Sequence, residues 1–187
     1  MLKSNLLRGA RLRLTAVANS DLGVIENWWS DAGFLRLYDA GPAYPRSRAR
    51  LAKRVEEGQK GQSNFLFGIR TLSDDLLIGL LELDGVTWSN GTTFFSVAIG
   101  DQANRRQGYG REATSLGLDF AFQELNLHRV CLTVFEYNSA AIALYERMGF
   151  THEGSFREHL HRDGKRHDML LYGMLRHEWR ATNQGGP

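Results

Sequence analysis

Cysteine and proline are scarce in this sequence, and it has no long apolar run. Its 187 residues include one cysteine, Cys131, so the chain can form neither an intramolecular disulfide nor a thiolate zinc cluster. A transmembrane helix needs about 18 consecutive apolar residues, and no such stretch occurs. Residues 1–14 also lack the apolar segment of a secretory signal. These absences predict a protein of the reducing cytoplasm that does not span a membrane.

The charge is nearly balanced, with 23 basic and 21 acidic side chains and a formal net charge of +2. This balance gives no support to a nucleic-acid protein. Two basic clusters, at 46–54 and 157–166, are interpreted as solvated surfaces. The chain has three prolines and neither repeats nor a linker, so we expect a single domain over residues 1–187.

The apolar pattern predicts an α/β fold in which helices flank a mixed, mostly antiparallel sheet. The predicted strands are 11–14, 65–70, 76–83, 92–99, 129–135, 156–161 and 167–175. The predicted helices are 19–29, capped by Asn19 or Ser20, then 47–58, capped by Ser47, and 108–125 and 138–148. Segment 31–45 is predicted to be a loop, and Asp163-Gly164 a two-residue hairpin turn.

The stretch 99–111, IGDQANRRQGYGR, leaves a predicted strand and opens a predicted helix. The first amides of a helix lack internal partners and lie at the positive end of its dipole, so they can hold phosphate oxygens. Glycines at 108 and 110 let a pyrophosphate approach the backbone, and nearby arginines add charge-assisted bonds. The same pattern is also found in an ordinary strand-to-helix turn.

A second informative segment is 138–150, NSAAIALYERMGF, which follows the strand 129–135. Asn138 can cap the helix or offer its amide to a ligand. Tyr145 lies on the helix face that is directed at the sheet, where a tyrosine usually packs in the core.

Together these two segments resemble the cofactor motifs of the GNAT superfamily of acetyl-coenzyme A-dependent N-acetyltransferases. Residues 105–110, RRQGYG, fit its pyrophosphate motif: Gln or Arg, two residues, Gly, one residue, Gly or Ala. Segment 138–150 fits its second motif, which ends in Tyr-Glu, two residues and Gly-Phe. The opening GARLRL and the closing hairpin resemble the branch of ribosomal-protein N-terminal and spermidine acetyltransferases. Arg106 departs from the pattern, because many members carry glycine there.

The resemblance implies that acetyl-CoA binds between two splayed parallel strands and that an amine attacks its thioester directly. It also implies that Tyr145 protonates the departing thiolate and that Asn138 binds the pantetheine arm. Backbone groups near Ile99 would orient the acetyl carbonyl. The remaining cofactor-binding residues implied are those of the pyrophosphate turn: Arg105, Arg106, Gln107, Gly108, Tyr109, Gly110 and Arg111.

An attacking alkylamine must lose a proton, because its pKa near 10.4 keeps it charged at neutral pH. Glu82 is the candidate base. It lies in an apolar strand, on the same side as Ile78 and Leu80 by alternation, where burial would raise its pKa. The alternatives are a solvated carboxylate at this position and a water chain as the base.

The acceptor amine, a protein α-amino group or a small molecule, is not identified by the sequence. Its pocket is expected from the front region, together with Glu82 and the terminal hairpin; the front residues are Trp28, Trp29, Phe34, Arg36, Tyr38 and Asp39. The two tryptophans, however, more often pack a core. A polyamine would need several carboxylates there, which the sequence offers in Glu26, Asp31, Asp39, Glu82 and Asp84.

Other residues receive ordinary interpretations. Cys131 is expected to be a buried small apolar residue, and His159, His161 and His167 to be solvated or to lie at the substrate rim, with no metal required. The alternatives to an enzyme are a non-catalytic acetyl-CoA-binding regulatory module and a nucleic-acid binder that uses the basic helix. A homodimer is left open.

Overall fold

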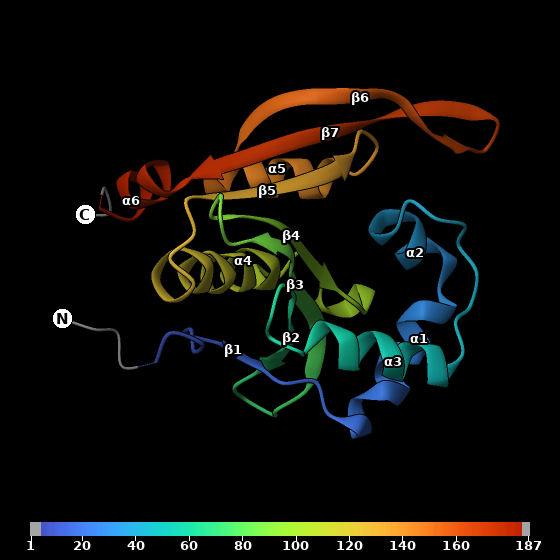
Figure 1. Cartoon of the computed structure of the whole chain (residues 1–187). Coiled ribbons are helices and arrows are strands. Elements are labelled where there is room, and N and C mark those ends of the chain that lie inside the picture. The colour runs from blue at the N-terminus through green and yellow to red at the C-terminus, as the bar shows by residue number, and fades with distance from the viewer. Residues whose placement is uncertain (1–4, 185–187) are drawn as a thin grey trace.

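The computed structural model describes residues 5–184, which form a seven-stranded sheet with helices on both faces (Figure 1). The strands are β1 (Leu12–Thr15), β2 (Phe65–Thr71), β3 (Leu77–Thr87), β4 (Thr92–Ile99), β5 (Arg129–Phe135), β6 (Thr151–Arg162) and β7 (Lys165–Leu175). The α-helices are α1 (Leu22–Ser30), α2 (Ala32–Tyr38), α3 (Arg48–Gly58), α4 (Tyr109–Asp119), α5 (Ser139–Met148) and α6 (Arg176–Gln184). A π-helical turn, Phe120–Glu124, extends α4.

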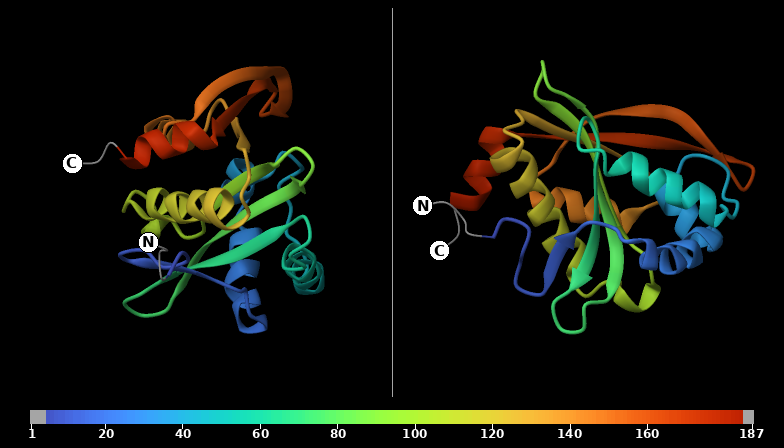
Figure 2. Two further views of the ribbon diagram at one scale, coloured as in Figure 1. Left: turned by 60° about the vertical axis from the view of Figure 1, so that its left-hand side comes forward. Right: turned by 60° about the horizontal axis from the view of Figure 1, so that its bottom comes forward.

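The order of the strands is β1-β2-β3-β4-β5-β7-β6, and only β4 and β5 run parallel. Their pairing is short, because it joins Thr92, Thr93 and Phe94 to 129–131 and then stops. Beyond this point the two strands diverge, and β5, β6 and β7 form an arm that stands apart from β1–β4 (Figure 2). The splayed parallel strands implied by the resemblance are therefore present.

Two apolar clusters cover the two faces of the sheet. Leu81, Leu83 and Phe95 pack with α4 and α5 in the larger one. Leu66 and Leu80 pack with α1, α2 and α3 in the smaller one. Successive residues of β3 thus serve opposite clusters, as strand alternation requires. All predicted strands and helices are present, with ends that differ by a few residues.

The predicted loop at 31–45 was wrong in its first half, which is the helix α2. Asp31 caps α2 by accepting a hydrogen bond from the Gly33 amide at 2.7 Å. Phe34 and Leu35 then turn into the smaller cluster, where Phe34 packs against Trp28 and Trp29. Both tryptophans are core residues, as expected from their size.

Of the predicted N-caps, Asn19 and Ser20 were wrong, whereas Ser47 and Asn138 do hold the N-cap positions of α3 and α5. A 3₁₀ turn at Asn19–Asp21 precedes α1, and the Asp21 carboxylate accepts the Ala18 amide at 2.8 Å. Neither Asn19 nor Ser20 caps α1, and Ser47 holds the N-cap position of α3 without a side-chain hydrogen bond. Gly149 ends α5 in the left-handed conformation, directly after the predicted helix end at 148.

The C-terminal hairpin is confirmed, with Asp163 and Gly164 at φ 49° and 75° in its turn. Both strands are longer than predicted, and β6 forms an edge of the sheet. The helix α6 was not predicted. Within residues 5–184, no helix has the length and apolar character needed to cross a bilayer.

Candidate active site

The divergence of β4 from β5 opens a cleft into the sheet. From Phe95 to Ile99, β4 bonds to β3 on one side, while its pairing with β5 has already ended on the other. Backbone amides and carbonyls on that open side lack a strand partner, and buried backbone groups need partners. The two amide groups of a pantetheine arm match this requirement, so the open edge of β4 fits acetyl-CoA.

The turn between β4 and α4 adopts the conformation that an anion site requires. Gly108 is the N-cap of α4 and has φ 83°, in the left-handed region that glycine tolerates. Arg106, which stands where many GNAT members have glycine, has φ 60°. An arginine is strained in this conformation, and its presence keeps the turn shape that glycine normally supplies. The first amides of α4 remain available for phosphate oxygens.

Arg11 of the segment before β1 holds this turn from outside. Its Nη1 donates to the Gln107 carbonyl at 2.9 Å, and its guanidinium lies 4.8 Å from the Tyr109 ring centre. Glu112 of α4 accepts the backbone amides of Arg11 and Leu12 at 2.7 and 3.1 Å. Burial raises the pKa of Glu112, but these hydrogen bonds outweigh it and hold the pKa below its usual range. Arg11 and Glu112 were not identified from the sequence, because their pairing spans about one hundred residues.

A cleft of about 340 Å³ runs from this turn along β4 and α5 to α2. Five of the sequence-predicted cofactor residues line it: Ile99, Arg105, Arg106, Gly110 and Asn138. Arg105 also braces the end of β4, because its guanidinium donates to the carbonyls of Ile99 and Gly100. Asn138 caps α5 through a hydrogen bond from the Ala141 amide at 3.3 Å, which leaves its NH₂ group directed at the Leu37 carbonyl.

The other cofactor residues flank the cleft. Gly108 and Arg111 line a neighbouring groove that also includes Arg11 and Arg147. Gln107 and Tyr109 are not among the described residues that line the cleft. Gln107 instead donates to the Ala103 carbonyl at 2.5 Å, inside the turn.

Tyr145 lies deeper, on an inner cavity of about 180 Å³ between β4, β5 and α2. Its side chain is 6% exposed, and no hydrogen bond to its hydroxyl is found within residues 5–184. Burial and the neighbouring Tyr38 raise the pKa of the Tyr145 hydroxyl above its ordinary value of 10.0. The cavity and the cleft share the lining residues Leu37, Tyr38, Val97, Asn138 and Ala141, so they lie directly beside each other.

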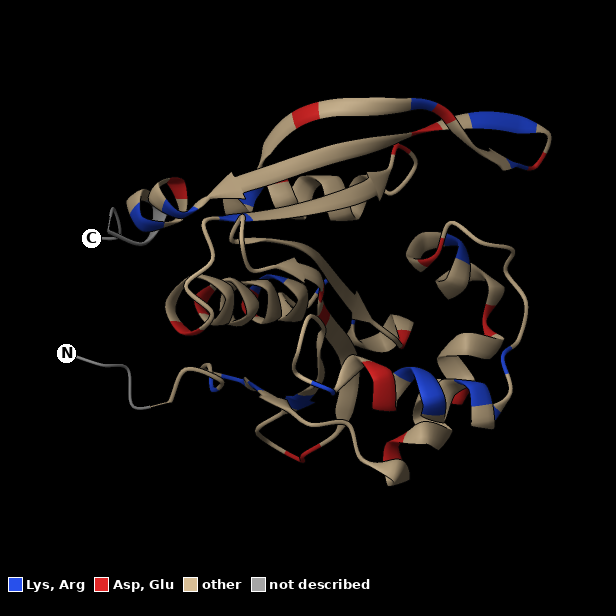
Figure 3. Ribbon diagram, viewed as in Figure 1, with Lys and Arg blue, Asp and Glu red and all other residues tan. Residues whose placement is uncertain are grey.

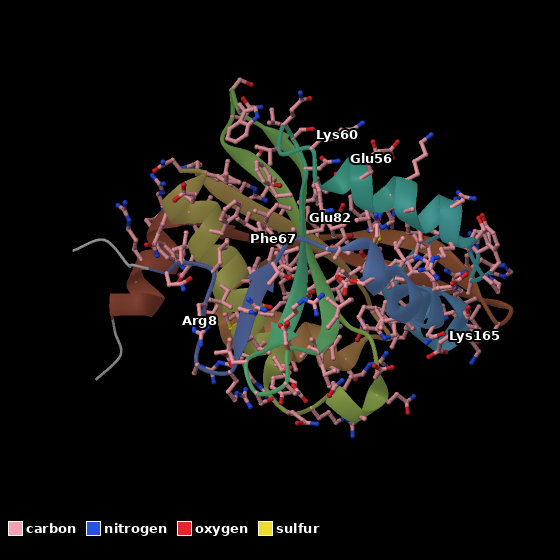
Figure 4. All side chains as sticks on the ribbon, turned by 90° about the horizontal axis from the view of Figure 1, so that it is seen from below. Arg8, Glu56, Lys60, Phe67, Glu82 and Lys165 are labelled. Carbon is pink, nitrogen blue, oxygen red and sulfur yellow. The ribbon has the colours of Figure 1, made fainter. Side chains whose placement is uncertain are left out.

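Glu82 lies at the centre of β3, beside the end of α3 (Figure 4). It faces the same side as Leu80, as predicted, but Ile78 packs on the other side because the register of β2 and β3 shifts there. Its carboxylate is 8% exposed and accepts from Arg54 Nη2 at 2.7 Å. Burial raises the pKa of Glu82, Arg54 partly offsets this effect, and Asp84 adds to it.

Arg54 links Glu82 to the inner cavity. The same Nη2 donates to the Tyr38 hydroxyl at 2.8 Å, and that hydroxyl also bonds to Ser96. Tyr38 and Ser96 line the cavity, whereas Glu82 is not among its lining residues in the described part of the chain. Burial raises the pKa of Tyr38, although Arg54 opposes the shift. The sequence offered no sign of this network, because its members come from α2, α3, β3 and β4.

The interpretation of the basic clusters as solvated surfaces was wrong for three arginines. Arg54 and Arg46 form ion pairs with Glu82 and Asp39, and both arginines are largely shielded from solvent. Arg162 donates to the Asp39, Ala40 and Gly41 carbonyls at 2.8 to 3.1 Å.

The ordinary interpretation of Cys131 is confirmed, since its side chain is buried. Among the histidines, His167 Nδ1 lies 2.7 Å from a carboxylate oxygen of Glu136. The described residues contain no group of three or more potential metal ligands.

These features define a class: a fold whose parallel strands open to receive a coenzyme A thioester, with an anion turn at one end and a buried tyrosine at the other. The family model for the acetyltransferase (GNAT) domain matches residues 11–151, and the chain belongs to this family. It is therefore an acetyl-CoA-dependent N-acetyltransferase that transfers an acetyl group to an amine.

Two curated proteins and one solved structure illustrate what this chain is similar to. The SPbeta prophage-derived uncharacterized N-acetyltransferase YokL of Bacillus subtilis is 31% identical over 175 residues, 94% of this chain and 96% of that one. The putative ribosomal N-acetyltransferase YdaF of Bacillus subtilis is 39% identical over 62 residues, 33% of this chain and 34% of that one. Among solved structures, the Vibrio cholerae spermidine N-acetyltransferase in complex with CoA and spermine has a TM-score of 0.83 at 26% identity. That match covers 92% of this chain and 99% of the other.

Proposed function

We propose that the cleft holds acetyl-CoA along β4 and that the inner cavity receives a primary amine. The open edge of β4 near Ile99 pairs with the pantetheine amides, and the Asn138 amide binds the same arm. The first amides of α4, with Arg106 and Arg111, hold the pyrophosphate. Acetyl-CoA supplies an acetyl group activated as a thioester. The relatives include enzymes named for spermidine, which supports an amine acceptor.

Tyr145 is the proposed general acid. Its hydroxyl lies on the cavity where the cleft ends, and there it donates its proton to the departing sulfur. Burial makes the hydroxyl a weaker acid than a free phenol. The same burial raises the pKa of a thiol that leaves in this cavity, so the two groups stay matched. The observation that carries this role is the placement of the Tyr145 hydroxyl in the cavity without a protein partner.

Glu82 is the proposed base, and it acts through the network rather than by direct contact with the amine. A proton from the amine passes to the cavity-lining hydroxyl of Tyr38 or Ser96, which gives its own proton to water, and Glu82 receives a proton from that water. Arg54 stays charged throughout and holds Tyr38 and Glu82 in place as their shared hydrogen-bond donor. Arg54 favours the ionised form of Glu82, because its charge and hydrogen bond offset part of the rise in pKa that burial causes.

Replacing the proposed acid tests this assignment. We expect Tyr145→Phe to lower kcat by about 10² to 10⁴ while leaving the Kd of acetyl-CoA nearly unchanged, because only a proton donor is lost. Release of free thiol measures turnover, and calorimetry measures binding. Tyr172→Phe is the matched control, since Tyr172 is 3% exposed and its hydroxyl bonds to Glu146, away from the cavity. Unchanged turnover in Tyr145→Phe would return this tyrosine to a packing role.

A further inference from the structure

The mouth of the inner cavity carries more positive than negative charge. Residues of α2 and the loop residues Asp39 and Ala40 line the cavity here. The tip of the β6–β7 hairpin lies against this loop through Arg162, which bonds to the Asp39 and Ala40 carbonyls without itself being among the described lining residues. Figure 3 shows basic residues at this hairpin tip and residues of both signs on the facing helices. The acceptor must pass these groups, so their pairing decides which amines are admitted.

Each carboxylate at this mouth already has a cationic partner. Asp39 pairs with Arg46, Glu82 with Arg54 and Asp163 with Arg36. Burial raises the pKa of Asp39, but the Gly41 amide and Arg46 outweigh it, so the pKa is lowered and the carboxylate stays ionised within its pair. Glu136, directly after β5, bonds to His167.

The carboxylates that a polyamine would need are therefore not available together. Of the five that the sequence offered, Asp39 and Glu82 are neutralised by arginines, and Asp31 caps α2. Glu26, Asp31 and Asp84 carry no ion pair among the described residues, and of these Asp31 is engaged in its cap. A spermidine-like acceptor would bring additional ammonium groups to a mouth in which the acids are already partnered.

Arg162 has no such partner. Within residues 5–184 it forms no ion pair, and its Nη2 is directed at three backbone carbonyls. Its Nε is buried without a hydrogen-bond acceptor. A guanidinium that is held by neutral carbonyls keeps its full charge beside Asp39 and Ala40, which line the cavity.

We infer that the acceptor of this enzyme is a primary amine that carries a carboxylate, and that Arg162 is the residue that selects for it. A carboxylate near the amine would be attracted by this guanidinium, which forms no ion pair among the described residues and has only the longer-range field of Asp163 beside it, whereas a second ammonium would be repelled. This inference rests on the proposed function, because it concerns the acceptor of the same reaction. It separates this chain from relatives named for spermidine.

The test uses primary amines that differ only in the group at the chain end opposite the reacting amine. At each of two chain lengths, four and six carbons, thiol release is measured with an ω-amino acid, an alkylamine and a diamine. We expect kcat/KM for the amino acid to exceed that for the diamine by about tenfold, with the alkylamine between them. Because the advantage is electrostatic, the ratio should fall toward one at about 1 M salt.

Arg162→Gln should bring the ratio of amino acid to diamine close to one. Ratios within one variant cancel any general loss of folding or of acetyl-CoA binding. Arg166→Gln removes the same charge from an exposed position of the hairpin and should keep the preference. If Arg162→Gln does not fold, the salt dependence of the wild-type ratio still decides.

The inference would be overturned if kcat/KM were higher for the diamines or for spermidine, or equal for the amino acid, the alkylamine and the diamine. Either result would leave the acetyltransferase assignment intact. Failure of every amine to release thiol would instead contradict the proposed function.

Discussion

The pKa of Glu82 depends on two charged neighbours that shift it in opposite directions. Burial and Asp84 raise the pKa of Glu82 above its ordinary value, and Arg54 lowers it. If Glu82 is the base, the plot of log kcat/KM against pH bends where Glu82 ionises, and its slope falls by one unit as the pH rises through that point. That pH should lie above about 4.5, the ordinary value.

Three substitutions make this residue-level prediction directional. Arg54→Gln should move the bend up by about one pH unit, because the compensating cation is lost. Asp84→Asn should move it down, since a repelling carboxylate is removed. Glu82→Gln should abolish it. The pH of the bend does not depend on the absolute rate, so even a variant with reduced activity still gives the pKa of the base. A bend that persists in Glu82→Gln would assign the base to another group.

At the scale of elements, the turn before α4 concentrates the backbone strain of the site. Arg106 at φ 60° costs about 1–2 kcal/mol, whereas glycine adopts this conformation freely but loses about 0.4–1 kcal/mol through its greater freedom when unfolded. Arg106→Gly should therefore raise the free energy of unfolding by about 0.5–1 kcal/mol, measured from urea midpoints.

Two control variants separate strain from side-chain loss. Arg106→Ala keeps the strained backbone and should not stabilise the protein. Gly108→Ala should destabilise the protein for two reasons: the backbone of residue 108 has φ 83°, and an added Cβ would lie 3.1 Å from Arg11 Nη2. Both Arg106 variants lose the guanidinium, so both should bind acetyl-CoA more weakly by a similar factor. Equal stabilisation by alanine and glycine would show that strain is not the cause.

Elements with strong local signals were predicted from the sequence, and those decided by distant contacts were not. Gly149 stops α5 and Asp163-Gly164 turns the hairpin because their left-handed conformations are local requirements. The helix α2 has seven residues, too few for a clear apolar period, and its stability depends on aromatic packing against α1.

The same distinction holds in the active site. The pyrophosphate turn and Tyr145 belong to contiguous motifs, and the structure places the turn at the cleft and Tyr145 at the adjacent inner cavity. Tyr38 was expected in the acceptor pocket and lines the inner cavity, whereas Arg54 and Arg162 were missed as site residues. Each of these two arginines acquires its role from a partner 16 or more residues away. A single sequence without its tertiary contacts gives no measure of such pairing.

At the scale of the whole molecule, the sheet consists of two halves that are joined along only three residue pairs between β4 and β5. Acetyl-CoA bound in the cleft would bridge these halves, since it contacts β4 on one side and α5 on the other. At one hundred times its Kd, such a ligand stabilises the native state by about 2.7 kcal/mol. For a chain of this length, we expect Tm to rise by about 5–10 °C.

Hydrogen exchange locates this stabilisation and distinguishes its two parts. Acetyl-pantetheine, which lacks the nucleotide, should protect amides at 95–99 of β4, where the strand has no partner on the β5 side. ADP, which carries only the nucleotide and pyrophosphate, should protect amides at 107–111, at the start of α4. Acetyl-CoA should protect both regions and raise Tm more than either fragment, because it alone links the open edge of β4 to the turn. Protection confined to the outer strands β1 and β6 would contradict this account of how the ligand joins the two halves.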